Sequence, residues 1–377
     1  MNKIIRIMLV FVPLAFVAEF ALHNPILIFA TSAIALVPLA GLLGEATEEL
    51  AIHTGPRIGG LLNATLGNAA ELIITIVALQ HGKYELIKAS LTGSIIGNLL
   101  LILGFSLLLG GLRHGVQRFD PKLTGMSASM MFLAVIGLMI PTLFELVKEA
   151  GTGRVQPMHT EVFDKQLIII SLGVAGVLIL MYVLSLVYQF RTPGATLGSH
   201  TGFEEAEEIM THKASWSIKT SVAVLAVSTL AIVFMSEFLV GVVEPVAQSL
   251  GIRELFLGVI LIPIVGNVAE HLVGVQAAMK NQMELSLNIS LGSSMQIALF
   301  VAPLLVFLSL FIGPAATGAG FFGRPQLTLF FSLFEVITLG LSVIIAAFIS
   351  LDGESNWLEG AMLLAVYIIA ALGFFYL

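Results

Sequence analysis

The chain has 377 residues, of which 58% are hydrophobic and 11% are charged, and its formal net charge is −7. About a quarter of the residues of a soluble globular protein are charged, so this composition excludes a soluble enzyme or a nucleic-acid-binding protein and predicts an all-α polytopic membrane protein. The chain has no cysteine, which excludes disulfide bonds and a cysteine-ligated zinc site. We expect a lipid bilayer around it and no permanently bound cofactor.

Long apolar runs follow one another along the chain. A helix that crosses a membrane takes about 20 such residues, and polar turns divide the runs into eleven expected transmembrane helices. In chain order these are residues 4–22, 26–44, 56–80, 86–111, 123–147, 165–190, 217–243, 253–279, 284–312, 327–350 and 357–376.

One polar connection, residues 192–216, is longer than the others near the middle of the chain. Apolar residues at helical spacing predict a short amphipathic helix in it. Two interpretations stay open: a solvated charge run, or an element that attracts cations to a pore mouth or regulates transport. Its acidic residues are Glu204, Glu205, Glu207 and Glu208.

The two halves of the chain are related. At an offset of 199 residues, 13 of the 56 positions from Glu45 to Leu100 are identical, where chance would give about five. Each half has five expected helices, and because five is odd, the second half enters the membrane from the opposite side, which is typical of transporters with a site at the repeat interface. We therefore divide the chain into an added first helix (1–24), two inverted-topology five-helix repeats (25–191 and 217–377) and the acidic linker between them (192–216).

The charge distribution predicts the orientation. With an odd number of helices, the side that holds the N-terminus and the acidic linker has 10 of the 17 Lys and Arg residues, which favours a cytoplasmic N-terminus. The chain has no long N-terminal extension, and this fits a prokaryotic plasma membrane better than a vacuolar one.

A carboxylate and an amide interrupt one apolar run in each half. The motif Gly-Asn-x-x-Glu contains Asn68 and Glu71 in the first half, and Asn267 and Glu270 at the same offset in the second. Residues three apart on a helix face the same way, so each motif offers oxygens to one point. A charged residue at the centre of a membrane helix costs about 2.5–3.5 kcal/mol, so two of them predict an ion or proton pathway rather than packing.

More oxygen-bearing side chains follow in a second motif of each half. All these ligands are oxygens, which suit a hard cation such as Ca²⁺, and two carboxylates neutralise its charge. For any one of these serines and amides, an ordinary hydrogen bond between helices is the alternative. The candidates are Ser94, Asn98, Ser293, Ser294 and Gln296.

The repulsion between the two carboxylates in an empty site predicts that protons are the counter-ion. Two ionised carboxylates about 6 Å apart repel by roughly 3 kcal/mol at an effective dielectric constant of 20, so the empty pair takes up protons. Cation and protons then compete for the same oxygens, and this competition is the basis of exchange.

Other residues near the motifs are weaker candidates for the ion or proton pathway. His271 is a possible proton relay or a satisfied buried histidine, and Glu335 is a second candidate for a proton pathway. Helix breakers precede each motif, Pro56 with Gly59 in the first half and Pro263 in the second, and predict interrupted helices there.

These motifs resemble those of the calcium/cation:proton exchangers of the calcium/cation antiporter superfamily. The resemblance covers nearly the whole chain and is carried by GNAAELI at 67–73, GSIIGNLLLILG at 93–104, GNVAEH at 266–271 and GSSMQIALF at 292–300. It implies that Glu71 and Glu270 bind Ca²⁺ and protons, that the amides and serines named above lie in or beside the site, and that an acidic helix lies on the cytosolic side. It also implies that inward proton flow drives Ca²⁺ export.

Alternative functions stay open, some of them exchangers for other ions and others outside the exchangers. A sodium-coupled Ca²⁺ exchanger is the nearest, although that branch carries Thr-Ser-x-Pro-Glu where this chain has Gly-Asn-x-x-Glu, and an exchanger for another divalent cation such as Mn²⁺ is a further one. An intramembrane protease would need membrane-depth aspartates or a His-Glu-x-x-His motif, and the three aspartates all lie in polar connections. A channel would share the acids without proton competition. The oligomeric state stays open.

Overall fold

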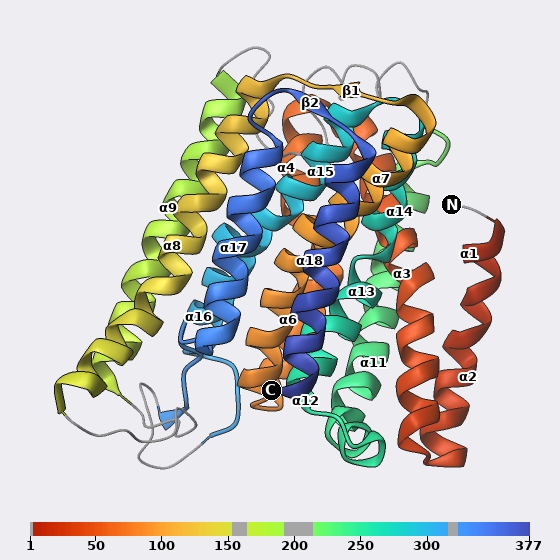
Figure 1. The fold of residues 1–377 in the computed structure, drawn as a ribbon. Coiled ribbons are helices and arrows are strands. Elements are labelled where there is room, and N and C mark those ends of the chain that lie inside the picture. Colours follow the sequence, from red (N-terminus) through yellow and green to blue (C-terminus); the bar gives the residue numbers. More distant parts are fainter. Residues whose placement is uncertain (1–2, 153–163, 192–213, 316–322) are drawn as a thin grey trace.

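The computed structural model describes residues 3–152, 164–191, 214–315 and 323–377. The chain forms a bundle of long helices (Figure 1) with one small antiparallel pairing of β1 (Gln117–Arg118) and β2 (Glu354–Ser355). The helices of the first half are α1 (Lys3–Ile7), η1 (Met8–Val10), α2 (Phe11–Val17), η2 (Ala18–Leu22), α3 (Pro25–Thr54), α4 (Pro56–Leu66), α5 (Ala69–Gln80), α6 (Tyr84–Ile96), η3 (Gly97–Ile102), α7 (Leu103–His114), α8 (Pro121–Thr152) and α9 (Lys165–Arg191). Those of the second half are α11 (Ile218–Leu250), α12 (Glu254–Phe256), η4 (Leu257–Leu261), α13 (Ile262–Gly266), α14 (Val268–Met279), α15 (Met283–Gln296), η5 (Ile297–Val301), α16 (Ala302–Leu308), α17 (Leu333–Ile349) and α18 (Trp357–Tyr376).

The all-α membrane architecture is confirmed. Among the described residues, eight helices are long and apolar enough to cross a membrane, and the pair Glu254–Gly266 and Glu270–Met279, bent by 63°, makes a ninth span if it is counted as one. Two shorter apolar helices, Ala69–Gln80 and Leu333–Ile349, lie where two further spans were expected. The chain is therefore an integral membrane protein, while the count of eleven helices stays a prediction.

The expected helix interruptions occur, but at the motifs themselves. Asn68 (φ −101°, ψ 31°) separates α4 from α5, and Asn267 (φ −98°, ψ 5°) separates α13 from α14. Pro56 instead begins α4, because proline is favoured in the first turn, where its missing N–H is not needed. The breaks therefore place each amide between two helix ends.

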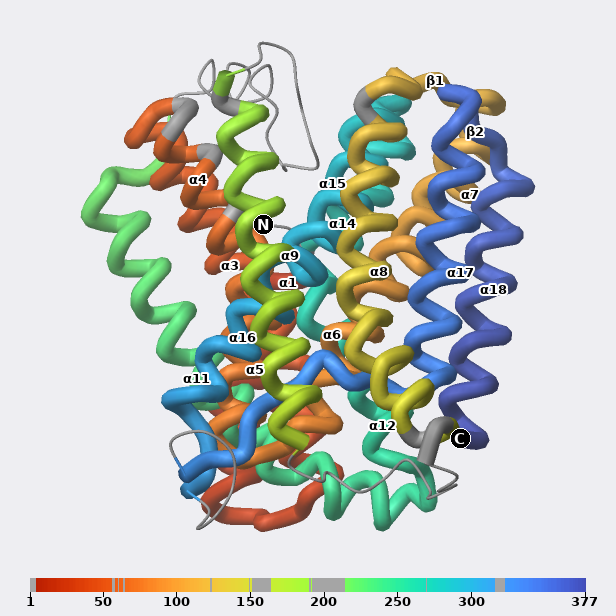
Figure 2. Tube along the Cα trace, turned by 90° about the vertical axis from the view of Figure 1, so that its left-hand side faces the viewer, coloured from red at the N-terminus to blue at the C-terminus, as the bar shows by residue number. Residues whose placement is uncertain are grey.

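One expected helix, 327–350, is wrong at its start. Residues 324–332 are not helical, and α17 begins only at Leu333. Ser332 caps it, accepting from the backbone N–H of Glu335 while the Glu335 carboxylate accepts from the N–H of Ser332. We call residues 324–332 the connecting segment; Figure 2 shows it in blue, running across the bundle from the α16 side to α17.

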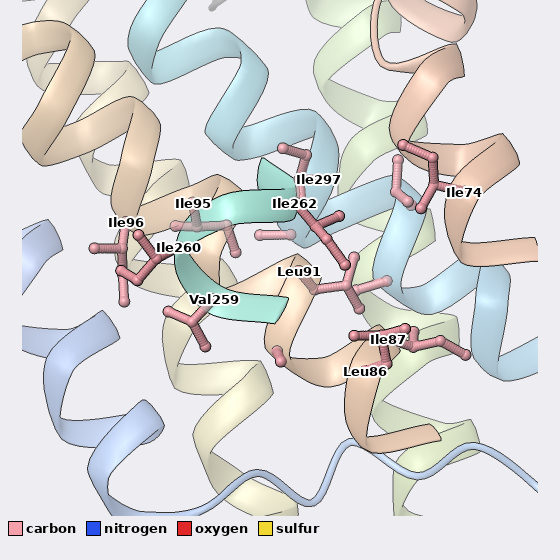
Figure 3. Packing of buried hydrophobic residues seen from close by; sticks show 14 of the residues in the cluster. Ile74, Leu86, Ile87, Leu91, Ile95, Ile96, Val259, Ile260, Ile262 and Ile297 are labelled. Atoms are coloured by element: carbon pink, nitrogen blue, oxygen red, sulfur yellow. The ribbon is translucent and has the colours of Figure 1, made fainter. Parts of the chain in front are cut away.

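Helices α6 and α15 form the centre of the bundle. The most apolar 18-residue stretches of the spans that they begin, Tyr84–His114 and Met283–Leu308, are 72% and 78% buried, against 11–56% in the other long spans. Figure 3 shows α6 residues such as Leu91 and Ile95 packed beside Val259 and Ile262 of the second half. Both central helices carry the second motif of their half, so the packing brings these motifs to the middle of the protein.

Candidate functional site

The two glutamates lie at equivalent positions in the two halves. Glu71 is in the first turn of α5, and Glu270 is in the first turn of α14. The start of a helix carries unsatisfied N–H groups and the positive end of the helix dipole, which favours negative charge there. The breaks after Gly67 and Gly266 thus create two helix N-termini at the centre of the bundle, one beside each carboxylate.

Hydrogen bonds between equivalent positions join the halves. Asn267 Nδ2 donates to Ser94 Oγ (3.1 Å), and Ser293 Oγ donates to Asn68 Oδ1 (2.8 Å). Under the offset of 199, Asn68 corresponds to Asn267 and Ser94 to Ser293. The structure therefore brings the first motif of each half against the second motif of the other half.

Both polar atoms of the Asn68 side-chain amide have a hydrogen-bond partner. Besides accepting from Ser293, it donates from Nδ2 to Oε1 of Gln296 (2.6 Å), and Asn98 Nδ2 donates to Ser293 Oγ (3.0 Å). The repeats differ here, because Gln296 corresponds to Gly97 and Asn98 to Ile297. This chain of amides and one hydroxyl connects α15, the α4–α5 break and η3 and orients Asn98.

Three oxygens of the candidate residues are buried without a hydrogen-bond partner among the described residues. They are Glu71 Oε1, Asn98 Oδ1 and Asn267 Oδ1. Glu71 reaches toward the other half, because a Cβ built on Gly266 would lie 3.1 Å from its Oε1, and its charge acts on that of Glu270. Buried oxygens normally have a partner, and a cation or protons would provide one.

The remaining predicted residues have more varied surroundings. Ser294 Oγ donates back along its own helix to the carbonyl of Ser290 (2.8 Å). His271 is half-buried beside Glu270. Glu335 is buried and accepts from the backbone N–H of Ser332 (2.9 Å) and from Thr92 Oγ1 (3.2 Å), so it has a structural task at the start of α17. The four glutamates of the linker, 204, 205, 207 and 208, lie outside the described residues.

The packing differs between the two ends of the site. On the side of η4 and α13, a Cβ on Gly93 would overlap the carbonyl oxygen of Val259, and a Cβ on Gly258 would lie 2.6 Å from Cβ of Ala89, so these elements pack tightly on α6 (Figure 3). On the other side, Ile58 of α4 is 56% exposed, and the residue at its equivalent position, Leu257, is 0% exposed. We call these the α4 side and the α12 side of the molecule (Figure 1).

Residue types alone did not reveal every part of the site. The sequence pattern identified both asparagines but did not predict that each of them stands at a helix break. The adjacent Gly-Asn pair in each motif was the available indication of a break. The carbonyl oxygen of Pro263, in the turn before the second break, accepts from both the backbone N–H and Nδ2 of Asn267 (3.0 Å each). The buried Lys88, three residues after Glu85, had no pattern that singled it out.

Comparison with known proteins gives consistent matches over the whole chain. A family model for sodium/calcium exchanger proteins matches residues 24–191 and 220–376. A Ca²⁺/H⁺ antiporter of Aphanothece halophytica is 42% identical over 383 residues, covering all of this chain and 97% of its own length. The Ca²⁺/H⁺ antiporter ChaA of Bacillus subtilis is 38% identical, with full coverage of both chains.

A solved structure has the same fold. The structure of native YfkE is 35% identical in sequence and superposes with a TM-score of 0.79, covering 99% of this chain and all of the other.

Proposed function

Because the chain belongs to the sodium/calcium exchanger protein family, a family of membrane transporters rather than enzymes, we propose that it exchanges Ca²⁺ for H⁺ by alternating access. The observation that carries this proposal is the duplicated Gly-Asn-x-x-Glu motif, whose Glu71 carboxylate reaches Gly266 of the other copy. The relatives in Aphanothece halophytica and Bacillus subtilis are Ca²⁺/H⁺ antiporters, and this supports protons rather than Na⁺ as counter-ion.

The ligand set suits a hard divalent cation. Glu71 and Glu270 would neutralise its charge, and the free oxygens of Asn98 and Asn267 add neutral ligands. Both carboxylates stand at helix N-termini, where the dipoles favour their ionised form when the cation is bound. Further hydroxyl ligands would come from Ser94 and Ser293, as they turn from their present partners.

Protons take the place of the cation when it leaves. Glu71 is 5% exposed and Glu270 is half-buried, and two neighbouring carboxylates with little access to water cannot both stay ionised without a cation because they repel. Protonated or cation-filled, the pair is close to neutral, so the site can close; empty and ionised, it cannot. Each ion therefore leaves only when the other replaces it.

Alternating access would exchange the roles of the two sides. The α4 side has the looser packing and the α12 side the tighter packing, so this arrangement corresponds to access from the α4 side. Helix α9 ends and α11 begins on that same side (Figure 1), so the acidic linker joins the chain there. With a cytoplasmic N-terminus in a prokaryotic plasma membrane, the α4 side would face the cytosol.

The test is Ca²⁺ uptake into liposomes containing the purified protein. We expect uptake driven by an imposed pH gradient, independent of Na⁺, and lost in Glu71→Gln and in Glu270→Gln. Glu354→Gln is the matched control, because that carboxylate is half-exposed and pairs with Arg118 away from the site; it should transport normally.

Each other result has a defined meaning. Dependence on Na⁺ would overturn proton coupling and support the sodium-coupled alternative. Uptake of Mn²⁺ in preference to Ca²⁺ under the same gradient would support an exchanger for another divalent cation. Normal transport by either site variant would overturn the paired-glutamate site itself.

A further inference from the structure

A buried cation lies outside the paired motifs. Lys88 of α6 is 4% exposed, and its Nζ lies 2.8 Å from Oε1 of Glu85, whose side chain is mostly exposed. An ionised residue inside a membrane helix bundle is costly and points to a function, and Ca²⁺/H⁺ exchange as proposed above assigns none to Lys88.

Lys88 belongs to a polar face of α6 that contacts the connecting segment and the start of α17. Tyr84, Lys88 and Thr92 are spaced four residues apart, so they lie on one face of the helix. Each of them has a different partner there. The contacts are Tyr84 Oη to the carbonyl oxygen of Pro325 (3.0 Å), Lys88 Nζ to the centre of the Phe330 ring (5.9 Å) and Thr92 Oγ1 to Oε1 of Glu335 (3.2 Å).

The connecting segment is also held by three other helices. Its alternate backbone N–H groups donate to hydroxyl groups, one each from the C-cap residue of α16, from α9 and from α8. Non-helical backbone at membrane depth is tolerated only where protein satisfies its polar groups, so these bonds let the segment cross the bundle. The bonds run from Leu327 to Ser309 (3.0 Å), from Leu329 to Ser171 (3.0 Å) and from Phe331 to Thr142 (2.9 Å).

The other half of the protein lacks both partners of this arrangement. At the offset of 199, the polar face of α6 corresponds to Met283, Leu287 and Leu291 of α15, which are all apolar and buried. The connecting segment corresponds to part of α8, which is a continuous helix from Pro121 to Thr152 and lies against α15. A polar face thus occurs only where the facing backbone is not helical.

The opposite face of α6 closes the cation site. Gly93 packs against Val259 of η4, and Ser94 accepts from Asn267. Helix α6 is therefore held between the connecting segment and the elements that seal the α12 side. Any shift of α6 relative to the connecting segment would therefore disturb its close contact with η4 at Gly93.

We propose that Lys88 is a positioning residue that holds α6 against the connecting segment. Helix α6 then stays in place when η4 and α13 move onto it and close the α12 side. The proposal rests on the proposed function, since it assigns η4 and α13 the closing movement of alternating access. Lys88 does not contact the cation. Its charge, fixed between Glu85 and the Phe330 ring, keeps the α12 side sealed.

Cysteine labelling tests this, because the natural chain has no cysteine. Ile58→Cys and Leu257→Cys place thiols at equivalent positions on the α4 side and the α12 side. We would measure their reaction with a water-soluble maleimide in detergent-solubilised protein, with and without Lys88→Met. We expect Lys88→Met to raise the labelling rate of Leu257→Cys at least about fivefold by shifting the population with an open α12 side, and to leave Ile58→Cys unchanged.

Rescue and a matched position separate positioning from general stability. Lys88→Arg should restore slow labelling of Leu257→Cys because it keeps the charge and the ring contact. Leu287→Met, at the equivalent position of α15, should change neither thiol. If Lys88→Met changes both thiols together, or changes neither while the protein stays folded, the proposal is overturned.

Two milder variants keep the test decisive should Lys88→Met fail to fold. Thr92→Val and Tyr84→Phe each remove one hydrogen bond to the same region, and both should raise the labelling of Leu257→Cys selectively; no change in either would overturn the proposal. Labelling does not require transport, so a wild-type protein without Ca²⁺/H⁺ exchange would overturn the proposed function separately.

Discussion

Helix α4 and the η4–α13 stretch occupy equivalent positions before the two motifs, yet their surroundings differ. Gly59 of α4 lies against Ala51 of α3, and Ile58 is largely exposed, whereas Leu257 to Ile260 are buried against α6. Their sequences differ accordingly: Asn63 and Thr65 of α4 correspond to Ile262 and Ile264. A polar stretch gains from facing water and an apolar one from packing, so related halves can favour one asymmetric arrangement.

This difference shows that the two halves of a duplicated site need not have the same surroundings in one structure. The same Gly-Asn-x-x-Glu motif forms a helix break in both halves, but the stretch before the second break, η4–α13, packs tightly on α6, whereas Ile58 in the stretch before the first is largely exposed. If the two arrangements are close in free energy, binding or release of an ion can exchange them. The predictions below test this asymmetry, from the largest expected effect to the smallest.

The largest effect should come from the site itself, where the halves are most alike. Glu71→Gln and Glu270→Gln each remove one of two charges that face the cation, and loss of a buried charge partner costs about 2–5 kcal/mol. We expect Ca²⁺ binding, measured by isothermal titration calorimetry, to weaken at least about 30-fold in both. A loss confined to one variant would mean that only one half binds the cation.

Access should differ strongly between the two sides in the unmodified background. Ile58 is 56% exposed and Leu257 is 0% exposed, so Ile58→Cys should react with a water-soluble maleimide at least about tenfold faster, because a thiol reacts only where water and reagent reach it. The measurement is the labelling rate by mass spectrometry. Equal, slow labelling of both thiols would show that α4 faces lipid and would contradict a difference in water access between the two sides.

The tight contact on the α12 side should not tolerate a methyl group. Gly93→Ala would force η4 away from α6, since the new Cβ overlaps the Val259 carbonyl, and overpacking of this kind costs about 1–3 kcal/mol. We expect a lower midpoint of thermal unfolding and reduced Ca²⁺ uptake. Gly241→Ala, in the helix α11 where a Cβ meets nothing within 4 Å, is the control and should lose neither property.

An exposed ion pair should make the smallest contribution. Lys83 Nζ lies 2.7 Å from Oε2 of Glu244 on the α12 side, and the equivalent positions on the α4 side are Gln282 and Glu45. Exposed pairs contribute little, so Lys83→Gln should raise the labelling of Leu257→Cys by less than about fivefold. Adding Glu244→Gln should cause no further change; an additional effect would mean that the two charges act independently.

Local sequence was enough to predict the membrane class, most helix positions and the pairing of the motifs. Hydropathy and polar turns can be recognised from a few neighbouring residues. The residue identities between the two halves at a constant offset can likewise be found without a structure. The helix start at Leu333 was missed because residues 327–332 are apolar enough to be taken for part of a membrane helix, while the hydroxyls of Ser309, Ser171 and Thr142 accept from their backbone N–H groups. Lys88 was missed because its partners, Phe330 and the region around Glu335, are more than 200 residues away.

The sequence by itself predicted two carboxylates and two amides at membrane depth in related halves, because such residues are costly there and their repetition points to a function. Only the tertiary structure decided which oxygens remain without partners, which side of the site is packed shut and what holds α6 in place. These depend on contacts between segments far apart in the chain. Where two related halves can adopt either of two arrangements, only the sum of all their contacts selects between them.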